Sequence, residues 1–319
     1  MKKYDVAAMG ELLIDFTQNG YSEQGNPVFE ANPGGAPCNV LAMLQKLGRK
    51  TAFIGKVGQD GFGLQLEKAL KETGISTEGL CFDKEVHTTL AVVQKKEDGD
   101  RDFSFYRKPG ADMMLCAEEV NEDLIRNAAI FHYGSLSLTD EPVRTATVSA
   151  IEEAEKAGVL LSFDPNLRKP LWESEELAKK QIRYGLGHCH VLKISDDELV
   201  WLTGEQDYEK AIQQLRSEFP IPLILLSMGK NGSRAYCGEE TAEAPAFLSE
   251  NTIETTGAGD TFMGCMLHQI LEKGYQNLST RDMEEMLTFA NAAASIITTR
   301  RGALRVMPEE EEILKRINF

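Results

Sequence analysis

Glu254-Thr-Thr-Gly-Ala-Gly-Asp-Thr-Phe-Met-Gly264 is the stretch that says most about the fold of this chain. Apolar residues recur after it at helical spacing as far as Ile270, and Gly274 ends the pattern. This spacing predicts a core-facing helix of about four turns. Asp260 then lies in the first turn of that helix.

The three small residues before Asp260 form a loop without bulky side chains. Gly257, Ala258 and Gly259 leave backbone N–H groups open at the helix N-terminus, where the positive end of the helix dipole favours an anion. A phosphate on these groups would place Asp260 close enough to accept a proton from a hydroxyl that attacks it. The alternative is an ordinary turn with an acidic residue at the helix start, and these four residues alone favour that alternative.

The composition limits the proteins to which such a site could belong. The chain has 319 residues, of which 42% are hydrophobic, so it can bury a full core. Its 34 basic and 50 acidic residues give a formal charge of -16, which makes nucleic acid and anionic membranes poor partners. The six cysteines include no C-x-x-C pair, and no apolar run is typical of a signal peptide or a membrane span. We therefore expect a cytoplasmic protein with reduced thiols.

From residue 120 onward, short apolar runs alternate with amphipathic segments. The runs lie at 129–133, 159–164, 191–195 and 223–227. This alternation is typical of an α/β fold with a mainly parallel central sheet flanked by helices. No internal repeat or flexible linker divides the chain, so one domain over residues 1–319 is predicted.

Polar residues gather where the predicted strands end. Arg168 follows one strand, Lys193 and Ser195 end the next, and Ser227 and Gly229 follow the last. In an open α/β sheet, ligands bind beyond the carboxyl ends of the strands. Simple strand termination is the alternative, and it explains Gly229 better than Lys193 or Arg168.

The first third of the chain departs from this alternation. Strand-like runs at 6–9 and 51–57 are interrupted by a segment rich in glycine and asparagine, and a hairpin follows with the turn pair Asp98-Gly99. We predict that segments at about 11–33 and 87–110 form a small β-sheet lid over a cleft, with Phe105 on the lid.

A second glycine-rich helix start is predicted at Gly34-Gly35. Paired glycines let the backbone approach a small ligand, and Asn39 can both donate and accept, as a sugar hydroxyl requires. An ordinary helix cap explains this segment, taken alone, equally well.

Three other nucleotide-binding motifs do not fit. The glycines of the stretch 55–63 lack the G-x-G-x-x-G spacing of an NAD site. The chain also has neither a Walker P-loop nor the catalytic loop of protein kinases.

Taken together, these motifs resemble the ribokinase-like carbohydrate kinases, the PfkB family. The segment from Gly34 to Gly63 is similar to the N-terminal signature of that family, and the segment from Thr255 to Phe262 to its C-terminal signature. The order and separation of the two signatures are highly specific, and the resemblance spans nearly the whole chain.

The resemblance implies a role for each matching residue. Asp260 is the expected catalytic base, and Gly257, Ala258 and Gly259 are the expected anion hole. The expected sugar-binding residues are Asp15, Gly34, Gly35, Asn39, Phe105, Arg107 and Arg168. The expected nucleotide-binding residues are Lys193, Ser195, Ser227, Gly229, Gly232 and Asn291.

Shorter segments are most similar to fructokinases. They include Phe105-Tyr-Arg107, Ala111-Asp-Met113 and the stretch from Asp164 to Arg168. They imply transfer of a phosphoryl group from ATP to the 6-hydroxyl of D-fructose. A 2-keto-3-deoxygluconate kinase is the alternative, because it shares the Tyr-Arg and Asp-x-Asn-x-Arg segments and an acid sugar needs a guanidinium partner. A ribokinase fits less well. A non-catalytic sugar sensor is the last alternative, and Asp260 after an intact Gly-Ala-Gly argues against it.

The family also implies cofactors and an assembly. ATP is the co-substrate, and Mg²⁺ is expected near Glu198, although Ser195 replaces the asparagine that is common three residues before that glutamate. A monovalent cation such as K⁺ is expected at Glu254, Thr256 and Gly302, although Glu254 replaces the usual aspartate. The implied arrangement is a homodimer through the lid.

Overall fold

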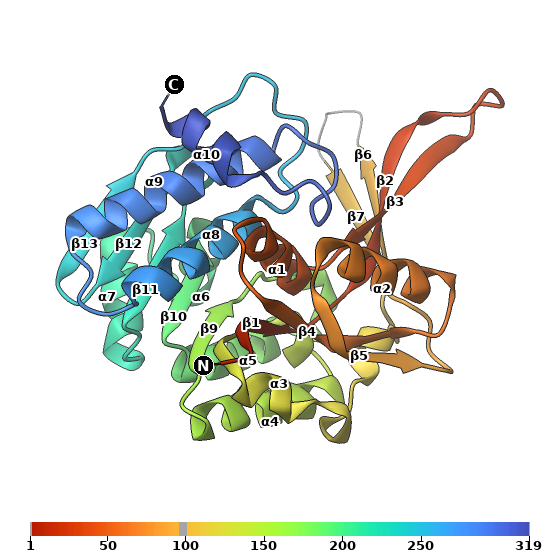
Figure 1. The fold of residues 1–319 in the computed structure, drawn as a ribbon, viewed down its shortest axis with the longest axis horizontal. Helices are drawn as coiled ribbons and strands as arrows, with labels where there is room; N and C mark the ends of the chain where they lie inside the picture. Colours follow the sequence, from red (N-terminus) through yellow and green to blue (C-terminus); the bar gives the residue numbers. More distant parts are fainter. Residues whose placement is uncertain (1, 96–100, 319) are drawn as a thin grey trace.

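The computed structural model describes residues 2–95 and 101–318, so the predicted Asp98-Gly99 turn lies outside the described residues. Two sheets are present in this part of the chain (Figure 1). The strands are β1 (Tyr4–Met9), β2 (Leu13–Tyr21), β3 (Pro27–Gly34), β4 (Thr51–Gly58), β5 (Ser76–Asp83), β6 (Leu90–Lys95), β7 (Arg101–Tyr106), β8 (Ala128–Gly134), β9 (Leu160–Asp164), β10 (Val191–Ser195), β11 (Leu223–Ser227), β12 (Ser233–Cys237) and β13 (Glu240–Ala244).

The larger sheet has the strand order β13-β12-β11-β10-β9-β8-β1-β4-β5. All neighbours from β11 to β5 are parallel, and only the pairs that β12 makes with β11 and β13 are antiparallel. The prediction of a mainly parallel α/β sheet is therefore confirmed. The carboxyl ends of β8, β9, β10 and β11 meet along one edge, because their register pairs Tyr133 with Phe163 and Ser195 with Ser227.

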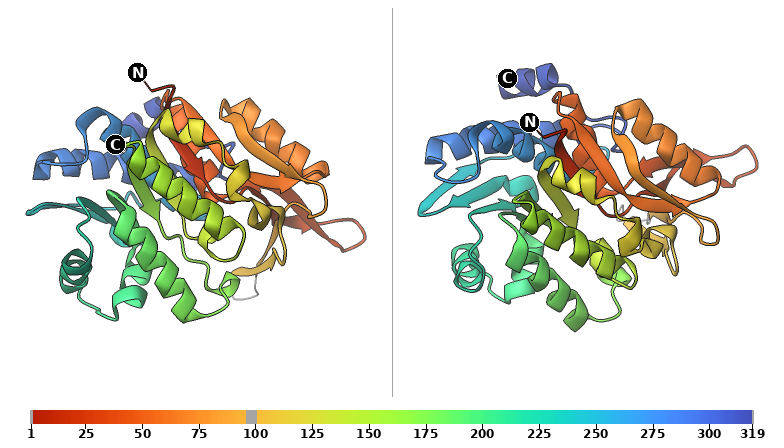
Figure 2. Two further views of the ribbon diagram at one scale, coloured as in Figure 1. Left: turned by 90° about the horizontal axis from the view of Figure 1, so that it is seen from below. Right: turned by 60° about the horizontal axis from the view of Figure 1, so that its bottom comes forward.

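Helices cover both faces of this sheet (Figure 2). The α-helices are α1 (Ala36–Lys46), α2 (Gly61–Thr73), α3 (Glu122–Arg126), α4 (Val143–Lys156), α5 (Glu175–His188), α6 (Asp196–Thr203), α7 (Tyr208–Glu218), α8 (Ala258–Lys273), α9 (Thr280–Ile297) and α10 (Glu310–Ile317).

Each face of the large sheet has its own hydrophobic core. Strand side chains alternate between the two faces, so Val6 and Ala8 join the core with α1, α8 and α9, whereas Ala7 and Met9 join the core with α4 and α5. Among the described residues, no helix is long and apolar enough to cross a lipid bilayer.

The smaller sheet has the order β3-β2-β6-β7. Both segments predicted for the lid supply its strands, and β2 joins them by pairing in parallel with β6. The far end of the β2–β3 hairpin projects away from the rest of the molecule (Figures 1 and 2).

Both predicted glycine-rich helix starts are present. Helix α8 begins after Gly257, whose φ of 77° is left-handed, and it ends at Gly274. Helix α1 begins after Gly35, whose φ is 127°. Such φ values favour glycine, which has no Cβ atom to clash with the backbone.

Candidate active site

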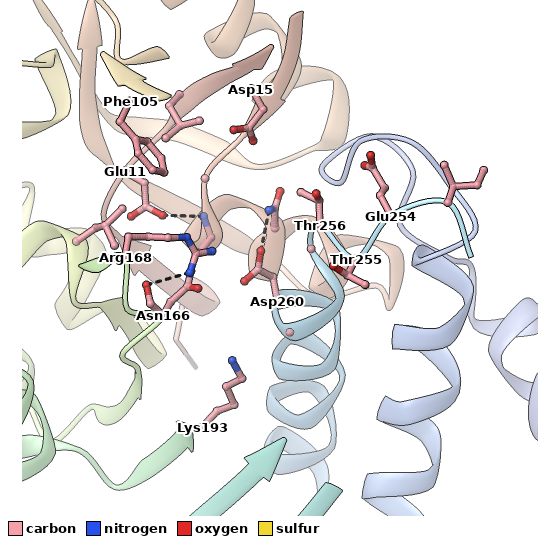
Figure 3. A pocket seen from close by; sticks show the side chains of 18 of the residues that line it. Glu11, Asp15, Phe105, Asn166, Arg168, Lys193, Glu254, Thr255, Thr256 and Asp260 are labelled. Carbon is pink, nitrogen blue, oxygen red and sulfur yellow. Dashed lines mark hydrogen bonds between the residues drawn. The ribbon is translucent and has the colours of Figure 1, made fainter. Parts of the chain in front are cut away.

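A cavity of about 590 Å³ lies where the small sheet meets the carboxyl edge of the large sheet (Figure 3). This volume is within the range of small-molecule sites. It is lined by Glu11, Leu13, Asp15, Gly35, Ala36, Asn39, Phe105, Leu136, Asn166, Arg168, Lys193, Thr252, Ile253, Glu254, Thr255, Thr256, Gly257, Gly259 and Asp260. The sequence therefore predicted much of this lining from segments that lie far apart in the chain.

Asp260 lies at the start of α8, in the middle of the cavity wall (Figure 3). Its Oδ2 atom accepts a hydrogen bond of 2.8 Å from the side-chain amide of Asn39 on α1. Burial raises the pKa of Asp260, while the bond from Asn39 and the charges of Lys193 and Arg168 oppose that shift. The carboxylate is thus oriented by one neighbour and is more basic than an exposed aspartate.

The loop before Asp260 is closely packed. A Cβ atom added at Gly257 would lie 2.7 Å from the Cβ atom of Ala303, and one added at Gly259 would lie 3.1 Å from Nζ of Lys193. A side chain at either position would crowd a neighbour, so the loop can present only backbone to a ligand. The N–H of Ala258 donates to the carbonyl of Thr255, whereas no described contact uses the N–H groups of Gly259 and Asp260, which makes the start of α8 suited to an anion.

Lys193 places a positive charge beside this loop. Its Nζ atom lies 2.9 Å from Oδ2 of Asp164, and both side chains are buried. Burial lowers the pKa of Lys193, but the attraction of Asp164 and Glu198 outweighs it and raises the pKa overall. For the carboxyl of Asp164, burial acts in the other direction and raises the pKa to about 6. The ammonium is therefore held charged and pointing toward the cavity (Figure 3).

Asp15 and the two paired glycines form another side of the cavity. A Cβ atom at Gly34 would lie 2.3 Å from Oδ2 of Asp15, and one at Gly35 would lie 2.3 Å from the carbonyl oxygen of Glu11. Burial raises the pKa of Asp15 to about 7, with Asp260 and Glu254 adding to the shift and Arg168 opposing it. Close backbone approach explains why glycine is needed at both positions.

Glu11 is a lining residue that the sequence reasoning did not include. Its Oε1 atom accepts a bond of 2.9 Å from the backbone N–H of Ala36, which holds the start of α1. Burial raises the pKa of Glu11 to about 7. A carboxylate next to Gly10 within an otherwise apolar run was the available signal.

Arg107, which was predicted to bind the sugar, does not line the cavity in this structure, so its contact with the sugar stays a prediction. Its side chain is buried behind the cavity wall, where its guanidinium donates to Asp112, to Thr139 and to the carbonyl of Leu136. Phe105 and Arg168, which were predicted alongside it, do line the cavity. Position on the hairpin was correct, but the direction of the side chain depends on partners far along the chain.

A second, shallower cavity of about 340 Å³ adjoins the first through Arg168 and Lys193. Ser195 and Glu198 line it, and they cap α6 reciprocally, because the Ser195 hydroxyl accepts from the Glu198 N–H and the Glu198 Oε2 atom accepts from the Ser195 N–H. The other carboxylate oxygen of Glu198 accepts from the N–H of Leu167 at 2.7 Å. Ser195 therefore replaces an asparagine without loss of the helix cap.

The remaining predicted nucleotide residues lie outside the linings of both cavities. Ser227 ends β11, and Gly229 and Gly232 lie in the β11–β12 turn. Asn291 of α9 bonds the Ser233 hydroxyl at 2.9 Å and donates to the carbonyls of Ala244 and Pro245 at 3.1 Å. In this structure its amide holds the ends of β12 and β13 together, so its contact with a nucleotide stays a prediction.

Glu254, Thr256 and Gly302 lie together, as predicted, around a small cavity that Asp15 and Ala303 also line. The Oε1 atom of Glu254 accepts from the N–H of Gly302 at 2.9 Å. The carbonyl of Thr298 accepts from the N–H groups of both Ile253 and Glu254. A carboxylate and backbone carbonyls are oxygen ligands of the kind that hard cations prefer.

The described residues contain no group of three or more His, Cys, Asp or Glu side chains arranged to hold a metal ion directly. Each oxygen of Glu198 has one backbone partner and retains acceptor capacity. These residues thus fit Mg²⁺ only in the form in which it keeps its own waters, as Mg²⁺ commonly does.

Comparison with known proteins places this geometry among sugar kinases. A family model described as pfkB family carbohydrate kinase matches residues 3–310. Probable fructokinase-4 of Arabidopsis thaliana is 43% identical over 312 residues, which cover 97% of this chain and 95% of that protein.

Solved structures similar to this chain include fructokinases. A fructokinase of Xylella fastidiosa with bound ATP has a TM-score of 0.89 and 30% identity, covering 99% of this chain and 98% of its own. A fructokinase of Vibrio cholerae O395 with bound fructose, ADP and calcium ion has a TM-score of 0.88 and 29% identity, covering 98% of both chains.

Proposed function

Because this chain belongs to the pfkB family of carbohydrate kinases, we propose that it transfers the terminal phosphoryl group of ATP to the 6-hydroxyl of D-fructose, giving fructose 6-phosphate and ADP. The observation that carries this proposal is the position of Asp260, which is buried in the cavity beside an open helix N-terminus and oriented by Asn39. The names of the relatives supply fructose as the acceptor.

Asp260 acts as the general base. Its carboxylate takes the proton of the attacking 6-hydroxyl while the oxygen of that hydroxyl forms a bond to the terminal phosphorus and the bond to the departing ADP oxygen breaks. Asn39 donates to one carboxylate oxygen and leaves the other for the sugar. The raised pKa of Asp260 strengthens it as a base near neutral pH.

The backbone of Gly257, Ala258 and Gly259 receives the negative charge of the transferring group. Donors that are fixed before reaction cost no reorganisation when charge develops on the phosphoryl oxygens. Lys193 adds a positive charge beside Gly259, and Asp164 holds its ammonium in place. Bound Mg²⁺, held through its waters at Glu198, would neutralise charge on the phosphates.

Asp15, Gly34, Gly35 and Asn39 bind the sugar hydroxyls in this proposal. Glu11 supports them by holding the start of α1 and lines the cavity itself. Phe105 covers the sugar from the small sheet, which excludes water that would compete as phosphoryl acceptor.

The charges of the lining favour a neutral sugar over 2-keto-3-deoxygluconate. Four carboxylates line the cavity, at Glu11, Asp15, Glu254 and Asp260, against the cations Arg168 and Lys193. Lys193 is already paired with Asp164, and Arg107 is turned away toward Asp112. An acid sugar would thus bring its charge toward carboxylates with Arg168 as its main partner, which is unfavourable.

Release of ADP, measured by a coupled assay, tests the reaction. Fructose should support turnover, whereas 2-keto-3-deoxygluconate and ribose at the same concentration should support much less. Mass spectrometry or enzymatic analysis of the product should find the phosphate on the 6-oxygen. Turnover with 2-keto-3-deoxygluconate above that with fructose would instead establish the acid-sugar kinase, and binding of fructose without any ADP release would establish a sensor.

We further propose that residues 1–319 form one domain whose small sheet acts as a lid, in a cytoplasmic homodimer clasped through that sheet. Tyr21 and Val28 on the projecting hairpin, and Tyr106 on β7, are large apolar side chains that stay exposed in the single chain, with 71%, 43% and 64% exposure. All three belong to strands of the small sheet, and exposed apolar side chains on one sheet are typical of an interface. Light scattering that gives the mass of a single chain at micromolar concentration would contradict the dimer.

A further inference from the structure

Asp112 accepts hydrogen bonds from both chain segments at the base of the β6–β7 hairpin, where β6 begins and β7 ends. Thr89 directly precedes β6, and its hydroxyl donates to Oδ1 of Asp112. Arg107 directly follows β7, and its Nε donates to Oδ2 of Asp112 at 2.7 Å. Asp112 itself lies in a short 3-10 helix, Ala111–Met114, that packs against β4 of the large sheet. We name these three residues, Thr89, Arg107 and Asp112, the hairpin clamp.

The hairpin clamp is dry and closely packed. The side chains of Arg107 and Asp112 are each 2% exposed, and Thr89 is buried as well. A Cβ atom at Gly110 would lie 1.8 Å from the Thr89 hydroxyl and 2.9 Å from Oδ1 of Asp112. Hydrogen bonds between buried charged groups are stronger than exposed ones, because water does not compete for the donors and acceptors. The clamp therefore restricts movement of the hairpin.

The hairpin clamp also reaches the wall of the cavity. Nη2 of Arg107 donates to the carbonyl of Leu136 at 2.9 Å, and Nη1 donates to the Thr139 hydroxyl at 3.0 Å. Leu136 lines the cavity, as does Phe105, which is two residues before Arg107. The guanidinium thereby fixes the spacing between the hairpin and the loop after β8.

The same hairpin fixes the strand that carries Asp15. Strand β6 pairs in parallel with β2, and Ala91 lies opposite Asp15 in that register. A shift of the hairpin would therefore move Phe105 and Asp15 together relative to Asp260, which lies on the large body of the molecule.

We propose that Asp112 is a positioning residue for the sugar: through the hairpin clamp it holds the small sheet where Phe105 and Asp15 meet the substrate. This inference rests on the proposed function, because it takes fructose to bind between the small sheet and Asp260. It gives a task to the Ala111-Asp-Met113 segment, whose aspartate is turned away from the cavity and touches no reacting atom.

Two variants test the proposal. Asp112→Asn keeps the size of the side chain but removes the charge that Arg107 needs, and Thr89→Val removes the hydroxyl at one end of the hairpin with little change of shape. The control is Glu119→Gln, which weakens the ion pair between an exposed carboxylate and the buried Lys56. Among the described contacts of Glu119, none involves the hairpin.

Steady-state kinetics should separate positioning from simple stability. We expect Asp112→Asn to raise the KM for fructose about tenfold or more, since small displacements of binding groups have large effects. The KM for ATP should stay within about twofold, because the nucleotide side lies on the large sheet. ATP hydrolysis without sugar transfer should increase. Thr89→Val should shift the same parameters less, and Glu119→Gln should leave both KM values near those of the wild type.

Amide hydrogen exchange in β6 and β7 provides a readout that needs no substrate. Exchange should be faster in Asp112→Asn and Thr89→Val than in the wild type and Glu119→Gln. Unchanged exchange in both clamp variants, or an equal rise in the KM for ATP and for fructose, would overturn the proposal. If Asp112→Asn does not fold, Thr89→Val decides by the same two measurements. If the wild type is inactive on fructose while the clamp variants still exchange faster than it does, the proposed function is overturned, but the restraint of the hairpin by the clamp is upheld.

Discussion

Asp112, which is buried, and Asp15, which is half-buried, are two carboxylates next to the small sheet, and they differ in their hydrogen-bond partners. Both oxygens of Asp112 accept hydrogen bonds, from Thr89 and Arg107. No described residue donates to the carboxylate of Asp15, and burial raises its pKa to about 7. A carboxylate that has a protein donor on each oxygen and lies outside the cavity lining holds the structure, whereas one that lines the cavity without a protein donor is available to a ligand.

Asp260 falls between the two. Asn39 satisfies one of its oxygens and orients the group, while the carboxylate still faces the cavity. The hydrogen-bond partners of these three aspartates support the roles proposed above: base for Asp260, sugar ligand for Asp15 and positioning for Asp112. Each of the following changes would break or sharpen that assignment.

Asp260→Asn should have the largest effect. The amide has nearly the same shape and cannot accept the proton, so kcat should fall on the order of 10²- to 10⁴-fold. Binding of ATP and fructose, measured by calorimetry, should change little. A variant that keeps near-normal kcat would show that another group is the base.

Asp15→Asn should come next, and it should act on sugar binding. Hydrogen bonds to a charged group contribute about 1.5–3 kcal/mol, so the KM for fructose should rise roughly 10- to 150-fold. The KM for ATP should hardly change. Initial rates at saturating ATP measure this, and an unaltered KM for fructose would remove Asp15 from the sugar site.

The stability of the ligand-free protein should depend on pH through Asp15. Burial raises its pKa from 3.8 to about 7, with added repulsion from Asp260 and Glu254, so the folded state holds the proton more tightly than the unfolded state does. The stability that this proton provides is complete below about pH 4 and is lost as the pH rises through about 7. Between pH 5 and pH 8, the wild type should lose on the order of 2–3 kcal/mol relative to Asp15→Asn.

Urea denaturation at the two pH values measures this difference. Asp112→Asn serves as the contrast to Asp15→Asn. It should be less stable than the wild type at both pH values, because it leaves Arg107 buried without its counter-charge. Equal pH dependence of the wild type and Asp15→Asn would contradict the assignment of Asp15 as the open, titrating carboxylate.

Glu254→Asp should have the smallest effect. Glu254 uses its longer side chain to reach the N–H of Gly302, and a shorter aspartate would lie closer to the carbonyls that are expected to hold a monovalent cation. We expect K⁺ to activate the wild type and the half-saturating K⁺ concentration to fall by a factor of about two to five in the variant. Initial rates at constant ionic strength test this; a higher half-saturating concentration, or no response of the wild type to K⁺, would contradict it.

Helices and strands that depend on residues close in sequence were predicted well. The starts of α1 and α8 follow from glycine before an apolar helical stripe, and β8 to β11 follow from short apolar runs between amphipathic segments. Strand β13 was not predicted, because its sequence Glu240-Thr-Ala-Glu-Ala244 is polar and short. It lies at an edge of the sheet, where only one neighbouring strand pairs with it.

By itself, the sequence determined the α/β class, the two helix starts that face the cavity and the identity of Asp260 as the expected base. The fold class and the helix starts depend on local periodicity and on the conformational freedom of glycine, which a few neighbouring residues define. Asp260 became the expected base through the resemblance of the whole chain to a family, because its own four residues favoured an ordinary turn.

Only the tertiary structure decided which way the long side chains turn. Arginine and asparagine are residue types that commonly bind ligands. In this structure, however, Arg107 donates hydrogen bonds to Asp112 and Leu136, and Asn291 is hydrogen-bonded to Ser233 and Ala244. The opposite holds for Glu11, which the fold brings to the cavity wall. A buried polar group must bond whatever partner the fold places beside it, and that partner is set by packing between distant segments, which the local sequence does not record.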